Sequence, residues 1–114
     1  LASAKNDLQV AYCLQQVQLS GGLMSVSKLT NDAGISQRHL SRKFQQCIGL
    51  SPKEYLRVYR FIQSLHYIKK YPVLSLTEIA YKSGYYDQAH FNRDYKTYTG
   101  YAPGELTHAQ HVLY

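Results

Sequence analysis

The stretch ISQRHLSRKFQQCIGLSPKEYL, residues 35–56, has a second version in the same chain, YYDQAHFNRDYKTYTGYAPGEL, at residues 85–106. When the two are aligned, with one extra residue admitted before Phe91, identical residues coincide at several positions. The coinciding pairs include Arg42 with Arg93, Gly49 with Gly100, Pro52 with Pro103 and Glu54 with Glu105. A chain that repeats one pattern in this way contains two small units of the same kind.

The size and composition of the chain are those of one globular domain. It has 114 residues, of which 45% are hydrophobic and 18% charged, a balance typical of folded proteins. No apolar run approaches the ~18 residues of a membrane span, and the polar amino end lacks a signal-peptide pattern. We interpret the two distant cysteines, Cys13 and Cys47, as reduced thiols rather than a disulfide or a metal pair. Together these features predict a cytoplasmic protein.

The charge of the chain favours a polyanionic partner. Thirteen Lys and Arg residues stand against seven Asp and Glu residues, which gives a net charge of +6 and a pI near 9.3. Cations that neutralise phosphates release condensed counterions, so a small basic domain gains affinity for nucleic acid. Many basic domains bind no nucleic acid, however, and charge alone does not decide the function.

Capping residues and glycine stops divide the chain into helices. A Ser, Asp or Asn before an apolar period predicts a helix start, and a Gly beyond the last turn predicts its end. Ser51 with Glu54 and Ser75 with Glu78 have the capping-box spacing, which gives the strongest start signals. About seven helices are predicted, over residues 8–19, from Ser25 to Gly34, from Ser36 to Cys47, from Ser51 to Lys70, from Ser75 to Gly84, over residues 88–98, and from Pro103 onward.

Apolar spacing predicts which face of a helix is buried. In the first helix, one side carries Leu8, Tyr12 and Leu19. In the long helix, a continuous stripe recurs at three- and four-residue steps and consists of Tyr55, Val58, Ile62 and Leu65. We expect both stripes to face a core.

The order of these helices predicts an all-α fold of two helix-turn-helix subdomains joined by a long linker helix. The first subdomain spans residues 8–50, the linker helix residues 51–71 and the second subdomain residues 72–107, all within one domain of residues 1–114. In each subdomain, a short helix, a turn that contains Gly34 or Gly84, and a second helix follow one another. A linker of about twenty residues is ~30 Å long, close to the ~34 Å between successive major-groove turns. One chain could therefore engage two adjacent grooves.

The second helix of each subdomain carries polar side chains that suit DNA recognition. Arg donates two hydrogen bonds to guanine, and Asn or Gln can pair with adenine, so Arg42 and Arg93 are the first candidates for base contacts. Further candidates for base contacts are Arg38, Ser41, Gln88 and Asn92. The candidates for phosphate contacts are Gln37, His39, Lys43, Lys96 and the amide groups at the helix starts capped by Ser36 and Asp87.

Two considerations oppose this interpretation. The same residues could form ordinary solvated helix faces, since polar residues cover every protein surface. In addition, Asp94 occupies the position of Lys43, and an acidic residue on the face that meets phosphates would weaken binding by the second subdomain. The pairing of Arg42 with Arg93 at equivalent positions nevertheless favours a shared function.

The repeated units resemble the DNA-binding domain of the AraC/XylS family of bacterial transcription regulators. The resemblance extends from about Leu8 to Leu106 and rests on AGISQRHLSRKFQQCIGLSPKEYLRVYR, residues 33–60, and LTEIAYKSGYYDQAHFNRDYKTYTGYAPGEL, residues 76–106. It implies an all-helical domain that binds double-stranded DNA sequence-specifically with two recognition helices. By position, the resemblance places base contacts on Arg38, Ser41, Arg42, Gln88, Ala89, Asn92 and Arg93.

The resemblance also implies partners and reveals departures. Members of the family usually have a separate effector-binding or dimerisation domain ahead of this one, so a full-length dimer through a missing amino-terminal domain is expected. RNA polymerase is a candidate partner besides DNA, and neither a membrane nor a cofactor is expected. Tyr85 and Tyr95 replace the usual Phe and need hydrogen-bond partners if they are buried. Ala89 stands where Ser is typical, and Thr107 where a basic residue often closes the motif.

The sequence supports other classes of function less well. An enzyme is not favoured, because the sequence has no Gly-rich phosphate loop, paired-Cys metal motif or nucleophile elbow. His108 and His111 have no third metal ligand nearby, so no metal is expected. A helical protein-protein interaction module is the stronger alternative, since twelve Tyr could supply anchors, and Tyr81 and Tyr86 do not fall at core spacing. RNA suits a recognition helix less well, because its major groove is deep and narrow.

Overall fold

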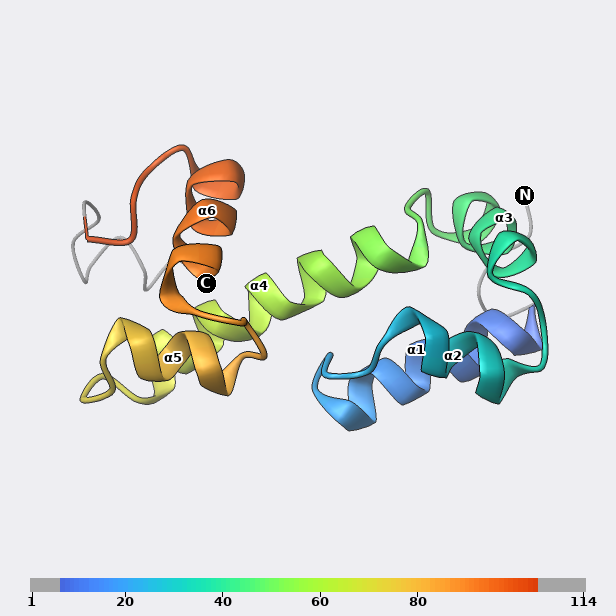
Figure 1. Ribbon diagram of the computed structural model, residues 1–114, viewed down its shortest axis with the longest axis horizontal. Helices are drawn as coiled ribbons and strands as arrows, with labels where there is room; N and C mark the ends of the chain where they lie inside the picture. Colours follow the sequence, from blue (N-terminus) through green and yellow to red (C-terminus); the bar gives the residue numbers. More distant parts are fainter. Residues whose placement is uncertain (1–6, 105–114) are drawn as a thin grey trace. The chain divides into compact units, whose positions relative to one another are not determined.

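The computed structural model describes residues 7–104 as α-helices and the turns between them (Figure 1). The helices are α1 (Leu8–Ser20), α2 (Val26–Ala33), α3 (Gln37–Cys47), α4 (Pro52–Lys70), α5 (Leu76–Lys82) and α6 (Gln88–Thr99). No strand occurs in this range, so the all-α prediction is confirmed. The helix predicted from Pro103 lies mostly outside the described residues, which end with a turn at Pro103 and Gly104. Among the described helices, none has the length and apolar character that a bilayer crossing requires.

The helix starts that were predicted from capping residues are confirmed. Six capping side chains accept hydrogen bonds from backbone N–H groups two or three residues onward, and they are Asp7, Ser25, Ser36, Ser51, Ser75 and Asp87. Both predicted capping boxes form. At the start of α4, the Ser51 N–H donates to Glu54 Oε1 at 3.0 Å, and the Glu54 N–H donates to Ser51 Oγ at 3.2 Å. The hydrogen bond from the Ser51 backbone lowers the pKa of the Glu54 carboxyl.

The chain divides into two compact units, with the boundary between Val58 and Tyr59, inside α4. The first unit contains α1, α2, α3 and the start of α4, and the second contains the remainder of α4 with α5 and α6. In the first unit α1, α2 and α3 pack on one another, and in the second unit α5 packs on α6 (Figure 1). Each unit therefore holds a short helix against the helix that follows its glycine turn.

The face of α1 that is buried is not the one that the sequence predicted. The fully buried residues of α1 are Val10, Cys13 and Val17. Leu8 is 82% exposed and Leu19 is 73% exposed, and Tyr12 of the same predicted stripe is also exposed. At about 100° per residue the two stripes lie on opposite sides of the helix, so α1 is apolar on both, and the smaller side chains face the core. Cys13 is a free thiol, and burial raises its pKa.

The core of the second unit is a cluster of buried side chains from α4, α5, α6 and the turn before α6. Its members are Phe61, Leu65, Ile79, Ala80, Tyr85, Phe91 and Tyr95. The Tyr95 ring meets the rings of Phe61 and Phe91 edge to face, each at 5.8 Å between centroids, an arrangement that stabilises aromatic pairs. The predicted stripe on α4 is correct for Leu65 and wrong for Ile62, which is 47% exposed. The prediction assumed that one face of the helix is buried along its whole length. Instead, α4 contributes to two separate units.

Candidate nucleic-acid interface

The turn between α2 and α3 and the turn between α5 and α6 have the same local structure. Gly34 has a φ of 72° and Gly84 a φ of 92°, in the left-handed region that residues with a side chain rarely adopt. A capping residue then opens the second helix. Ser36 Oγ accepts from the His39 N–H at 3.1 Å, and Asp87 Oδ1 accepts from the His90 N–H at 2.8 Å. In both units the sequence thus folds into a helix, a glycine turn and a capped second helix.

The helix α3 packs with one side in the first unit and leaves the other side exposed. Leu40 and Phe44 are fully buried, and Cys47 is half-buried. Of the predicted contact residues on the other side, Ser41 is half-buried. The exposed ones are Ser36, Gln37, Arg38, His39 and Arg42. Within residues 7–104, no ion pair engages Arg38 or Arg42. Their guanidinium groups are therefore available to an anionic ligand.

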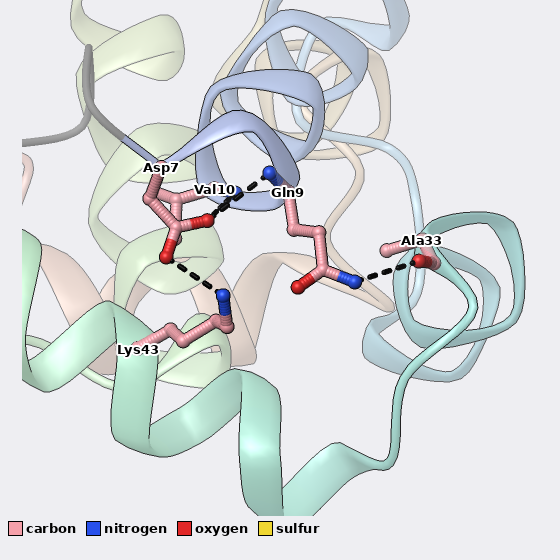
Figure 2. A network of polar contacts seen from close by, with 5 residues as sticks. All are labelled: Asp7, Gln9, Val10, Ala33 and Lys43. Carbon is pink, nitrogen blue, oxygen red and sulfur yellow. Dashed lines mark hydrogen bonds and ion pairs between the residues drawn. The ribbon is translucent and has the colours of Figure 1, made fainter.

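Lys43, a predicted phosphate contact, is bound within the first unit (Figure 2). Its Nζ donates to Asp7 Oδ2 at 2.8 Å, and the two side chains are only 22% and 16% exposed. Asp7 Oδ1 accepts from the N–H groups of Gln9 and Val10, both at 3.1 Å. The hydrogen bond from Lys43 holds the pKa of the Asp7 carboxyl below its ordinary value, against the opposing effect of burial. Gln9 Nε2 donates to Ala33 O at 3.3 Å, so the start of α1 is tied to both α2 and α3.

The helix α6 presents an equivalent side to solvent. Phe91 and Tyr95 are fully buried, while Tyr98 is 39% exposed and its ring lies tilted against Phe61 at 4.9 Å between centroids. Of the predicted contact residues, the exposed ones are Ala89, Arg93 and Lys96, and the half-buried ones are Asp87, Gln88 and Asn92. In the described part of the chain neither Arg93 nor Lys96 takes part in an ion pair.

Asp94 does not lie on the exposed side of α6, so the prediction that it weakens contact there was wrong. The residue is 2% exposed, and the Tyr85 hydroxyl donates to its Oδ2 at 3.0 Å. Burial, followed by the charge of Asp94, raises the pKa of Tyr85 above its ordinary value, so the phenol keeps its proton. The Arg60 guanidinium lies 5.3 Å from the centroid of the Tyr85 ring. Tyr85 therefore has the hydrogen-bond partner that its burial requires.

Two carboxamides of α6 have their oxygen atoms turned toward the protein. Thr77 Oγ1, from α5, donates to Gln88 Oε1 at 2.5 Å. Asn92 Oδ1 is buried and accepts no hydrogen bond from any described residue. A shallow groove of about 440 Å³ beside it is lined by Asn92, Arg93, Lys96, Thr97 and Ala102. Thr77 could not be recognised from the sequence, because a polar residue inside the capping box of α5 is expected on the helix surface without any further role.

Comparison with known proteins identifies the family. A family model described as a helix-turn-helix domain matches residues 29–109. The chain belongs to the AraC-type helix-turn-helix family. The resemblance seen in the repeated units is therefore confirmed. Over 79 residues, or 69% of the chain, this AraC-type domain is 30% identical to the HTH-type transcriptional activator RhaS of Salmonella arizonae. It covers 28% of that protein, and so spans about a quarter of the length of the curated relatives it matches.

Solved structures share the fold of this AraC-type domain. One is a transcriptional regulator with an AraC-type DNA-binding domain from Chromobacterium violaceum, with a TM-score of 0.80 and 20% identity over 90% of this chain and 92% of that one. Another is the DNA-binding domain of AdpA in complex with a target DNA, with a TM-score of 0.77 and 20% identity over 91% of this chain and 90% of that one. At this identity the likeness concerns the fold, and the prediction of two helix-turn-helix units is confirmed.

The remaining predictions concern exposed tyrosines and the carboxyl end of the AraC-type domain. Tyr81 is 60% and Tyr86 is 85% exposed, so neither is a core residue. In the described residues, no group of three His, Cys, Asp or Glu side chains could hold a metal ion. Glu105, Thr107 and the pair His108 and His111 lie outside the described residues.

Proposed function

We propose that this chain binds double-stranded DNA sequence-specifically to regulate transcription, and that α3 and α6 are its recognition helices. The observation that carries the proposal is the repeated local structure. Each unit holds a helix against a glycine turn and a capped second helix, whose exposed side carries basic side chains outside any described ion pair. A helix held in this way can lie in the major groove, where Arg, Asn and Gln read base edges.

The proposed contacts are those that the sequence suggested. The base contacts are Arg38, Ser41 and Arg42 from α3 and Gln88, Ala89, Asn92 and Arg93 from α6. The phosphate contacts are Ser36, Gln37, His39, Lys43, Asp87 and Lys96. Ser36 and Asp87 act by capping, since their helices then offer further backbone N–H groups to an anion. Lys43 would meet a phosphate while it also holds Asp7.

We assign residues 8–50 and 72–107 to the two subdomains and residues 51–71 to the linker helix. The 19 residues of α4 give a length of ~28 Å, comparable with the ~34 Å repeat of successive major-groove turns. This length supports the engagement of two adjacent grooves by one chain. For the whole protein we propose a cytoplasmic regulator that contacts RNA polymerase and dimerises through a separate domain. The name of the relative RhaS, a transcriptional activator, supports this role.

Selection of bound sequences from a pool of random duplexes tests the proposal. We expect one enriched motif with two half-sites about one helical turn apart. Affinity for that motif should fall steeply with salt, because each neutralised phosphate contributes about −0.9 to the slope of log affinity against log salt concentration. Lys96→Ala should reduce that slope by about 1. A pool from which no sequence is enriched would contradict the proposal.

A helical protein-protein interaction module is the alternative that the exposed apolar side chains favour. Leu8, Leu19 and Tyr86 are each more than 70% exposed, and large exposed side chains can anchor a partner. The salt titration separates the two functions. A Tyr-rich protein interface predicts little dependence of affinity on salt, whereas phosphate contacts predict a steep one.

A further inference from the structure

We infer that α6 reads the major groove mainly with hydrogen-bond donors and therefore selects guanine over adenine, and that Thr77 of α5 sets this preference by competing for the oxygen of Gln88. The inference rests on the proposed function, because it specifies which bases the same site accepts. It also differs from the sequence-based expectation, in which Asn and Gln pair with adenine. The difference arises from the hydrogen bonds that the side chains of α6 already make or lack.

The orientation of Gln88 is the first step. A Gln that pairs with adenine must accept from the adenine N6 amino group while it donates to N7. Here the Gln88 Oε1 atom accepts from Thr77 Oγ1 at 2.5 Å, so the oxygen is turned toward α5. Since a carboxamide is planar, its amino group then points away from Thr77. Thr77 thus occupies one of the two lone pairs of Oε1 and competes with a base for this oxygen, which favours contact with a base through the Gln88 amino group.

Asn92 follows Gln88 by four residues, one turn further along the same side of α6. Its Oδ1 atom is buried, with no hydrogen bond from the described residues. Any contact between Asn92 and a base must therefore run through its amino group. A second carboxamide of α6 is thus restricted to donation.

The other proposed contacts within α6 have no acceptor in their side chains. Arg93 and Lys96 carry only donors, and Ala89 has no polar group at all. Guanine presents two acceptors in the major groove, N7 and O6, whereas adenine presents a donor beside its N7 and cytosine presents a donor alone. A set of side chains that offers mainly donors matches guanine best and pairs poorly with the adenine N6 amino group.

The helix α3 differs from α6 at the equivalent position. In the repeat, Gln37 corresponds to Gln88, and Ser27 of α2 corresponds to Thr77. Gln37 is exposed, and within residues 7–104 its side chain makes no hydrogen bond. Gln37, a proposed phosphate contact, is therefore not held in one orientation, and of this pair only Gln88 has its oxygen engaged by a neighbouring hydroxyl. Ser27 also supplies a matched control for Thr77.

The test compares base preferences of the whole chain and of variants by selection from random duplexes. Gln88→Ala first identifies the base pair that Gln88 reads, as the position whose preference is lost. At that position the unchanged chain should prefer guanine to adenine by about tenfold. Thr77→Val, which keeps the shape and removes the hydroxyl, should bring adenine to within about twofold of guanine and leave the other positions unchanged. Thr77→Ser should keep the guanine preference.

Two further variants make the result specific. Thr77→Ala must give the same shift as Thr77→Val, and circular dichroism must show both variants folded, as the exposed position of Thr77 predicts. Ser27→Ala should change no preference. Two results would overturn the inference and leave the proposed function standing. One is a preference of the unchanged chain for adenine at the base pair that Gln88 reads, and the other is a base preference of Thr77→Val identical to that of the unchanged chain. If the unchanged chain enriched no sequence at all, the proposed function itself would fall.

Discussion

Lys43 of α3 donates a hydrogen bond to Asp7, the residue that caps α1, over 2.8 Å (Figure 2). The two side chains are 22% and 16% exposed. Lys28 and Asp32 form an ion pair of the same chemistry within α2, at 3.2 Å, but their side chains are 65% and 28% exposed. Within residues 7–104, one ion pair thus connects α3 to the residue that caps α1, and another lies on the surface of a single helix.

Removing each lysine should separate these two cases. Lys43→Met should lower the free energy of unfolding by about 1–2 kcal/mol, because it leaves the Asp7 carboxylate without its charged donor in a partly buried place. Lys28→Met should lower it by less than about 0.5 kcal/mol, as is usual for an exposed pair four residues apart. Urea denaturation followed by circular dichroism measures both. Equal losses would mean that the pair with Asp7 adds nothing beyond surface charge.

The lowered pKa of Asp7 predicts a pH dependence with a definite sign. The folded pKa lies below the ordinary value of 3.8, so the folded state favours the carboxylate. Its contribution to stability is fully present above the ordinary value and is lost as the pH falls through the folded pKa. Asp7→Asn keeps a capping oxygen but lacks this titration. The stability difference between the unchanged chain and the variant should therefore be constant above about pH 5 and shrink below pH 3.8. A difference that grew on acidification would contradict the ion pair.

Arg42 is expected to read a base rather than a phosphate. Arg42→Ala should cost about 1–3 kcal/mol of binding free energy on the selected motif and relax specificity at one base pair. Arg42→Lys keeps the charge but loses the bidentate fork, so it should relax specificity at the same base pair. Lys53→Ala, an exposed lysine in the first turn of α4, is the control and should leave base preference unchanged. An equal loss on every sequence would make Arg42 a phosphate contact.

The hydrogen bond between Tyr85 and Asp94 should stabilise the second unit. Tyr85→Phe removes the hydroxyl that donates to the buried carboxylate, so it should lower the free energy of unfolding by about 1–3 kcal/mol. Tyr86 is the adjacent residue and is 85% exposed, so Tyr86→Phe should have almost no effect. Thermal and urea denaturation of the two variants provide the comparison. A Tyr85→Phe variant as stable as the unchanged chain would show that Asp94 does not need the phenol.

Helix ends were predictable because capping is decided by residues within one turn of each other. Ser51 and Glu54, three residues apart, contain all the chemistry that starts α4, and the hydrogen bonds found there are those expected. The same holds for Ser36 and Asp87, which place the first residues of the two proposed recognition helices.

The buried faces and the partners of side chains were harder to predict, since they depend on residues far apart in the sequence. The two opposite apolar stripes of α1 cannot be ranked without knowing what packs against them. Lys43 and Asp7 are 36 residues apart, and Thr77 and Gln88 are 11 apart. Asp94 aligns with Lys43 in the repeat, yet Tyr85 holds it in the interior. Sequence alignment of the units therefore located the proposed contact helices but not the state of each side chain.

The passage of the chain from one unit to the other takes place inside α4, between Val58 and Tyr59. In an α-helix each N–H donates to the carbonyl four residues earlier, so peptide groups on both sides of this point belong to the same run of hydrogen bonds. Melting of either half would fray turns that the other half needs. Calorimetry should therefore record one cooperative transition, with equal calorimetric and van't Hoff enthalpies, rather than the two separate events of domains joined by a loose tether.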